Sequence, residues 1–394
     1  MTKKSIPQNT GRRELENREN GFLAPYAMRS HNSAGRRYEE PPPSNRTHYQ
    51  RDRDRIVHCT AFRRLEYKTQ VFVSHEGDYY RTRLTHTMEV AQIARTIARM
   101  LRLNEDLAEA VSYSHDLGHT AFGHSGEDAL NELMADHGGF EHNRQSLRVV
   151  EVLEDRYPAF RGLNLTFEVR ESIIKHTTVH DTPHPDMNEY FPDLRPLLEA
   201  QLVEVADSVA YDNHDLDDAL KMGIIRLKDI ESLELTSCAL DTARRNAGNA
   251  ASERQLAVQT VRHLIDLEIS DIAQTSAEGL SESSVSSPDD VRKASDNLIT
   301  WSDELKPQKN ELRAFLMDHV YNHYRTIRMQ RKAVRIMCDL FGAYMAEPNQ
   351  LPPYWRKWIE DVGRERGITD YMAGMTDRYA LGEHKKLFTP GEKV

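Results

Sequence analysis

Residues 86–116 read HTMEVAQIARTIARMLRLNEDLAEAVSYSHD, and this stretch decides the fold class. Its first half repeats apolar residues at the spacing of one helix face, at Val90, Ile93, Ile97, Met100 and Leu101. Its second half continues from Leu107 through Val111 to His115 in steps of four. Such spacing predicts two amphipathic helices, over 86–101 and 105–116. It also places His86 and His115 on the buried faces of their helices.

The same pattern extends along most of the chain. Leu198, Leu202, Val205 and Val209 predict a helix over 195–216, and strand-like alternation is hard to find. A mainly α fold is therefore expected. We expect a basic arm with little regular structure over 1–50 and a helical core over 51–230. Over 231–300 we expect a helical segment with a mobile Ser-rich loop (TSAEGLSESSVSS, 275–287), and over 301–394 a C-terminal helical region packing on the core.

Composition excludes several classes of protein. The 394 residues hold 39% apolar residues, and no run approaches the 18 consecutive apolar residues of a membrane span. The N-terminus lacks the apolar segment of a secretory signal. The three cysteines are odd in number and far apart, which argues against a disulfide framework or a zinc knot. A cytoplasmic protein without a membrane partner is expected.

Charge is unevenly distributed. The net charge is −10, yet residues 1–83 carry 17 Lys and Arg against 10 Asp and Glu, a local +7. A basic segment in an acidic protein suggests an anionic ligand, most commonly phosphate. The alternative is a solvated basic tail.

Seven of the 18 histidines lie between His75 and His142, and the densest string is SHDLGHTAFGHSGE at 114–127. Neighbouring residues on a helix point about 100° apart, so one metal ion reaches both His115 and Asp116 only near a helix end, which Gly118 is expected to supply. Together with His86 and Asp207 they would form a mixed nitrogen and oxygen site for a divalent ion. Each of these residues could instead be a hydrogen-bonded polar residue of the core.

Two other motifs nearly match and fail. Gly118 and Gly123 have P-loop spacing, but His124-Ser125 follows where Lys and Ser or Thr are required. GHSG at 123–126 places its second glycine one residue too early for a nucleophile elbow. Asp207, Tyr211 and Asp215 form a stripe at i, i+4 and i+8, which could line a ligand site or be a solvated helix edge.

Longer strings carry a family resemblance. His86, His115-Asp116 and Asp207 resemble the H…HD…D signature of HD-domain phosphohydrolases, and the chain is similar to the bacterial dGTPase-like deoxynucleoside triphosphate triphosphohydrolases. The strings that carry the second resemblance appear in family order: RDRDRI (51–56), TAFRRLEYKTQVF (60–72), RTRLTH (81–86), FEHN (140–143), AYDNHD (210–215) and MAGMTDRY (372–379). The resemblance implies an HD-domain helical bundle with additional C-terminal helices. Thr120-Ala121 stands where many relatives have prolines.

The resemblance also implies an activity: hydrolysis of dGTP or other dNTPs to the deoxynucleoside and inorganic triphosphate by attack of water at the α-phosphorus. It assigns a divalent ion, Mg or Mn before Co or Fe, to His86, His115, Asp116 and Asp207. His124 and Glu127 match an acid/base pair and His119 a histidine near the α-phosphate. The residues that match substrate contacts are Gln70 and Asp215 (sugar and 3′-hydroxyl), Tyr211 (deoxyribose ring), Arg83 (phosphate) and Asn143.

Several alternatives stay open. Our hypothesis is that His124 moves the proton and Glu127 orients it, although the match does not decide between them. The activity could be that of another HD phosphohydrolase, such as a nucleotidase, a cyclic-nucleotide phosphodiesterase or a guanosine-tetraphosphate hydrolase. A regulator that binds nucleotides or, weakly, single-stranded nucleic acid is the third reading. The resemblance further implies a homo-oligomer, a tetramer or hexamer, and in some relatives activation by a second dNTP.

Overall fold

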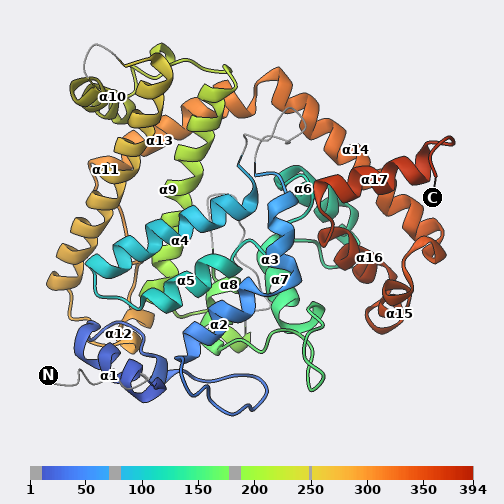
Figure 1. Ribbon diagram of the computed structural model, residues 1–394, viewed down its shortest axis with the longest axis horizontal. Helices are drawn as coiled ribbons and strands as arrows, with labels where there is room; N and C mark the ends of the chain where they lie inside the picture. The colour runs from blue at the N-terminus through green and yellow to red at the C-terminus, as the bar shows by residue number, and fades with distance from the viewer. Residues whose placement is uncertain (1–10, 71–80, 177–187, 248–250, 394) are drawn as a thin grey trace, which may run out of the picture.

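Helices make up most of the described chain (Figure 1). The computed structural model describes residues 11–70, 81–176, 188–247 and 251–393, and within these ranges the only β-type pairings are isolated bridges. The prediction of a mainly α fold is therefore confirmed. The first nine helices are α1 (Arg12–Phe22), α2 (His48–Val57), α3 (Thr60–Arg64), α4 (Arg83–Met100), α5 (Glu105–Ser114), α6 (His124–Leu133), α7 (His142–Arg148), α8 (Phe167–Ile174) and α9 (Leu198–Lys221). The others are α10 (Glu234–Ala247), α11 (Glu253–Glu282), α12 (Pro288–Arg292), α13 (Leu305–Leu316), α14 (Tyr324–Ala346), α15 (Pro353–Val362), α16 (Arg364–Ala373) and α17 (Asp377–Phe388).

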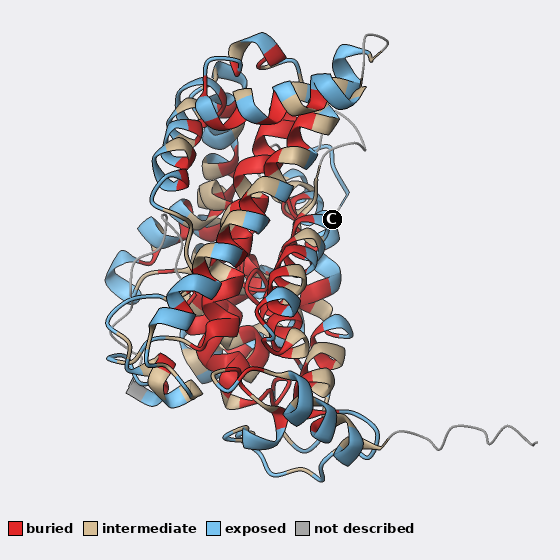
Figure 2. Ribbon diagram, turned by 90° about the vertical axis from the view of Figure 1, so that its left-hand side faces the viewer, coloured by how far each residue is buried: buried red, intermediate tan, exposed pale blue. Residues whose placement is uncertain are grey.

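The two helices predicted from residues 86–116 are α4 and α5, and they pack against each other and against α9. The Thr82 side chain accepts a hydrogen bond from the Thr85 backbone N–H, which caps the start of α4. Val90, Ile93 and Ile97 are fully buried, as their spacing predicted. Figure 2 shows the resulting band of buried residues through the central helices.

Three apolar clusters organise the part of the chain that the structure describes. The first lies around α2, α4, α5 and the first half of α9. The second joins α6 to the C-terminal helices α14, α16 and α17. The third surrounds the end of α9 together with α10, α11 and α13. Since α9 belongs to two of the clusters, polar residues from distant parts of the sequence can converge where the clusters meet.

Two expectations about irregular segments were wrong. Residues 12–22, in the expected arm, form α1, which is tied down because Glu19 accepts hydrogen bonds from the Ser30 backbone and hydroxyl. The Ser-rich stretch is helical as far as Glu282, the end of α11. Ile272 and Leu280 are buried on one face of that helix, so packing outweighs the weak helix propensity of the serines.

In the described part of the chain, no helix is both long enough and apolar enough to cross a membrane.

Candidate active site

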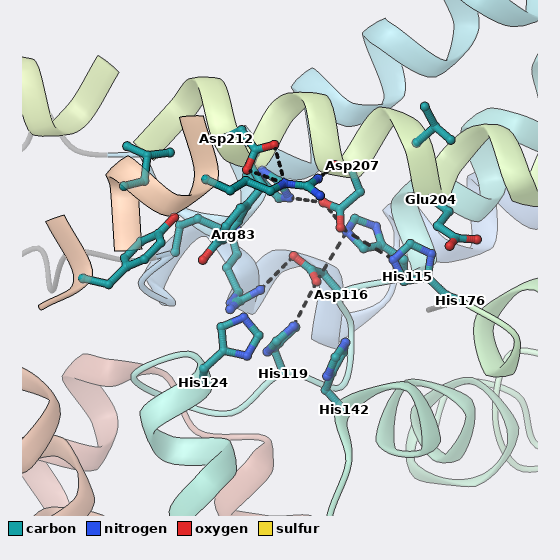
Figure 3. Close-up of a pocket in the computed structure, with 18 of the residues that line it drawn as sticks. Arg83, His115, Asp116, His119, His124, His142, His176, Glu204, Asp207 and Asp212 are labelled. Atoms are coloured by element: carbon teal, nitrogen blue, oxygen red, sulfur yellow. Dashed lines mark hydrogen bonds and ion pairs between the residues drawn. The ribbon is translucent and has the colours of Figure 1, made fainter. Parts of the chain in front are cut away.

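A cavity of about 360 Å³ opens beside α9 at the junction of the three clusters. One wall is α9, which contributes Glu204, Asp207 and Asp212 (Figure 3). The opposite wall carries three histidines: His119, in the turn before α6, and His124 and His142, the first residues of α6 and α7.

The structure brings together the four residues expected to hold a metal ion. His86 comes from α4, His115 and Asp116 follow α5, and Asp207 lies on α9. His86 Nε2 lies 2.8 Å from Asp207 Oδ1, and His115 Nε2 lies 3.4 Å from Asp116 Oδ1 and 3.7 Å from Asp207 Oδ1. Ligand atoms of His86, His115 and Asp116 all lie within 4.8 Å of one another. The group can therefore hold a divalent ion.

The protonation pattern of His115 fits a metal ligand. Its Nδ1 lies 2.6 Å from the Ser112 carbonyl oxygen, so Nδ1 is the nitrogen that carries the proton and donates it. Nε2 is buried and has no hydrogen-bond partner among the residues that the structure describes. Burial opposes a charge on this ring, but the Asp116 and Asp207 carboxylates outweigh it and raise the pKa of His115 to about 9. The two carboxylates thus favour a positive charge at Nε2, either a proton or a bound metal ion.

Local backbone geometry explains how adjacent His115 and Asp116 share one site. The helix α5 ends at Ser114, so both residues lie just beyond its last turn, rather than within a helix that ends at Gly118 as expected. Gly118 has a different role: a Cβ at this position would come within 2.1 Å of the Ser146 backbone nitrogen. The absence of a side chain thus lets α7 approach, which brings His142 to the cavity.

The C-terminal helices hold the turn that carries His119. Asp377 accepts hydrogen bonds from the backbone N–H groups of Thr69 (3.0 Å) and Phe122 (2.9 Å). The Lys68 ammonium donates to the carbonyl oxygens of His119 and Ala373. The region after α15 is therefore part of the support of the site.

The histidine wall forms a second cluster around Glu127. One carboxylate oxygen of Glu127 lies 2.9 Å from His142 Nδ1, and the other lies 3.5 Å from His124 Nδ1 and 3.9 Å from His119 Nδ1. Burial would raise the pKa of Glu127, but the surrounding histidines hold it well below its usual range, so the group is a carboxylate at neutral pH. Burial, followed by the nearby Arg83, holds the pKa of His119 well below its usual range, so this ring is neutral.

Ligand atoms of His119, Glu127 and His142 also lie within 4.8 Å of one another, but the orientation of the rings favours proton chemistry over a second metal ion. The rings of His119 and His142 are stacked, with centroids 4.0 Å apart and planes 19° from parallel. An imidazole lone pair lies in the plane of its ring, so nearly parallel rings direct their lone pairs along nearly parallel lines. Such lone pairs do not converge on one ion about 2.1 Å from each nitrogen.

Two polar side chains of the cavity have unused hydrogen-bonding capacity. Arg83 donates from Nη1 to Asp116 Oδ2 at 2.9 Å, while its Nε and Nη2 are buried and find no hydrogen-bond partner in the described part of the chain. Gln70 Oε1 is likewise buried and has no partner within residues 11–70, 81–176, 188–247 and 251–393. These atoms are available to a polar ligand.

The remaining predicted residues divide between the cavity and the layer behind it. Tyr211 lines the cavity beside Tyr321, with ring centroids 6.2 Å apart. Asp215 lies behind, where it accepts a hydrogen bond from the Tyr321 hydroxyl. Glu127 and Asn143 also lie outside the lining, and Asn143 donates to the His176 carbonyl oxygen.

Several lining residues were missed. His142 was visible in the histidine-rich stretch, but only its neighbour Asn143 was selected. No motif marked His176, whose Nε2 lies 3.6 Å from Asp207 Oδ2. Arg313, which forms an ion pair with Asp212 (2.9 Å), and Tyr321 also line the cavity. Both come from the segment after residue 300, and only the fold shows that this segment reaches the cavity.

Comparison with known proteins agrees with this arrangement. The HD-domain family model matches residues 83–212, and the phosphohydrolase-associated-domain model matches residues 299–386. Deoxyguanosinetriphosphate triphosphohydrolase-like proteins are similar over most of their length. The one from Geobacter metallireducens is 48% identical over 97% of this chain and 99% of the relative, and the one from Ralstonia pickettii is 51% identical over 93% and 95%. The chain therefore belongs to the deoxyguanosinetriphosphate triphosphohydrolase-like family of HD-domain hydrolases.

Proposed function

We propose that this protein hydrolyses a deoxynucleoside triphosphate to the deoxynucleoside and inorganic triphosphate. The observation that carries the proposal is that one cavity joins three features: the metal-ligand group, the histidine wall and the Tyr211 and Tyr321 rings. Such a cavity offers groups for a phosphate, for proton transfer and for a sugar. The names of the relatives support the choice of nucleotide.

Charge on the phosphate would be neutralised from two sides. A divalent ion, for which we favour Mg²⁺ or Mn²⁺ over Co²⁺ or Fe²⁺, would be held by His86, His115, Asp116 and Asp207, where it would stabilise phosphoryl oxygens as a Lewis acid. Arg83 would donate from its unpaired Nη2 to the same phosphate, because its ion pair with Asp116 fixes the guanidinium beside the ligand group.

Proton transfer is assigned to the histidine wall. His124 lines the cavity and its side chain is 39% exposed, whereas Glu127 lies behind it as a carboxylate. We therefore assign the proton transfer to His124, with Glu127 as the group that orients it. Neutral His119 would then contact the α-phosphate region from the same wall.

Recognition of the sugar is assigned to Tyr211 and Gln70, which both line the cavity. Tyr211 would pack on the deoxyribose and exclude a 2′-hydroxyl, and Gln70 would bind the 3′-hydroxyl through its unpaired Oε1. Because Tyr321 lies between Asp215 and the cavity, Asp215 would act by holding Tyr321. Asn143 would act indirectly, by holding the segment at His176.

The test is a substrate panel with a matched pair of variants. The purified chain is incubated with each dNTP and rNTP, and with nucleoside monophosphates and cyclic nucleotides, in the presence of Mn²⁺. The products are separated by anion-exchange chromatography. We expect deoxynucleoside and intact triphosphate from dNTPs. Preference for dNTPs over rNTPs should persist in Tyr211→Phe and decrease in Tyr211→Ala. A preference for nucleoside monophosphates or cyclic nucleotides would refute the proposal.

A further inference from the structure

His86 is held through both of its ring nitrogens by α9. Its Nε2 faces Asp207 Oδ1 at 2.8 Å, and its Nδ1 faces Nδ1 of His214 at 3.3 Å. Asp207 and His214 are seven residues apart, about two turns of α9, so they lie on the same face of that helix. His86 is therefore clamped between two α9 residues, only one of which belongs to the proposed metal-ligand group.

Behind His214 lies a fixed carboxylate. His214 Nε2 is 2.5 Å from Oε2 of Glu89, which lies one turn after His86 on α4. Glu89 also accepts a hydrogen bond from Arg81 Nε at 3.0 Å, and Arg81 pairs in turn with Asp217 at 2.6 Å. These contacts join α4 to the second half of α9 and hold the carboxylate in place.

The chain of contacts orders the protons. The carboxylate of Glu89 can only accept, so Nε2 of His214 is the nitrogen that carries a proton. The other nitrogen of a neutral imidazole is an acceptor, so Nδ1 of His214 accepts and Nδ1 of His86 donates. With a cation between Nε2 of His86 and Asp207, Nε2 would direct a lone pair at the cation; without one, the Asp207 carboxylate at 2.8 Å requires a proton on Nε2.

We propose that Glu89 and His214 form a positioning relay that sets the tautomer and ring orientation of His86 for binding a divalent cation. The relay rests on the proposed metal site, and neither residue touches substrate. Groups behind a ligand commonly change metal affinity 10- to 100-fold when removed. Each relay residue should therefore affect metal affinity more than turnover at saturating metal.

The two ends of the His214 ring can be replaced separately. The amide of His214→Asn lies near the Nδ1 position and can accept from His86, whereas the amide of His214→Gln lies near the Nε2 position and reaches only Glu89. We expect Asn to keep the Mn²⁺ affinity within about threefold of wild type and Gln to weaken it about 10- to 100-fold. The affinity is measured from the electron paramagnetic resonance signal of free Mn²⁺, and thermal unfolding in chelator compares the folded state of the variants.

Glu89 provides a second test, because its side chain is 40% exposed and tolerates substitution more readily. Glu89→Gln keeps an acceptor for His214 and should bind Mn²⁺ more tightly than Glu89→Leu. Equal Mn²⁺ affinity in His214→Asn and His214→Gln, or no difference between the two Glu89 variants, would overturn the relay, as would absence of Mn²⁺ binding by the wild-type chain. If the wild-type chain binds Mn²⁺ and leaves every dNTP intact, the proposed function fails while the relay stands.

Discussion

Replacing Glu199 by Gln should stabilise the protein at alkaline pH. Glu199 lies in the first turn of α9, the helix that carries Asp207, and is 0% exposed. Its Oε1 accepts hydrogen bonds from the backbone N–H groups of Met28 (3.0 Å) and Asn104 (3.1 Å), while Oε2 is buried and has no partner among the described side chains and backbone groups. The side-chain amide of Gln can keep both accepted hydrogen bonds. It also removes the negative charge that the buried carboxylate of Glu199 carries when it is ionised.

The size of the effect follows from the pKa. Burial raises the pKa of Glu199 from 4.5 to about 7 despite the two backbone hydrogen bonds. The folded protein then binds a proton more tightly than the unfolded chain, so the contribution of this group to stability is fully present below pH 4.5 and is lost as pH rises to 7. At about 1.4 kcal/mol per pKa unit, the loss approaches about 3 kcal/mol at pH 8.

The assay is urea unfolding of wild type and Glu199→Gln at pH 5 and pH 8. The stability of the variant relative to wild type should increase by about 2 to 3 kcal/mol between these two values. The control is Glu14→Gln, because Glu14 lies on the surface of α1, where its side chain is 54% exposed, and has no comparable burial cost. A relative stability of Glu199→Gln that is the same at both pH values, or lower at pH 8, would refute the reasoning.

Three further predictions concern the site and its support. His124→Ala should lower turnover about 10²- to 10⁴-fold while Mn²⁺ binding is unchanged, and near wild-type turnover would show that another group moves the proton. Titration of the metal-free protein should give one tightly bound Mn²⁺ per chain, which His115→Ala abolishes; a second tight ion would show that the histidine wall also binds metal. Burial lowers the pKa of Lys68 from 10.5 to about 7. Between pH 7 and pH 10.5, folding therefore releases a proton from this side chain. Unfolding is measured at pH 7, 8 and 9. The free energy of unfolding of wild type should rise by about 1.4 kcal/mol per pH unit relative to that of Lys68→Met. A difference between the two proteins that is the same at all three pH values would contradict this.

The helices that dominate the core were predictable because their apolar spacing repeats over several turns. Val90, Ile93 and Ile97 mark one face of α4 without any knowledge of what that face meets. The arm and the Ser-rich stretch were misjudged because their helices depend on particular tertiary contacts. Glu19 anchors α1 through Ser30, and Leu280 anchors the end of α11 in the core.

The candidate site divides in the same way. His86, His115, Asp116 and Asp207 carry a recognisable spacing, and the structure gathers them, while their role as ligands stays a prediction. The positions of Asp215 and Tyr321 were not accessible from sequence, since their hydrogen bond joins residues 106 positions apart. The contact of His86 with His214 was equally hidden, because it depends on the register with which α4 packs on α9.

The central claim is tested most directly by following the oxygen atom of water. The protein is incubated with each dNTP and Mn²⁺ in H₂¹⁸O, and the products are identified by mass spectrometry. Attack at the α-phosphorus predicts intact inorganic triphosphate that carries one ¹⁸O and a deoxynucleoside that carries none. Release of pyrophosphate or of a single phosphate, or ¹⁸O in the deoxynucleoside, would show that a different bond is broken and would contradict the account.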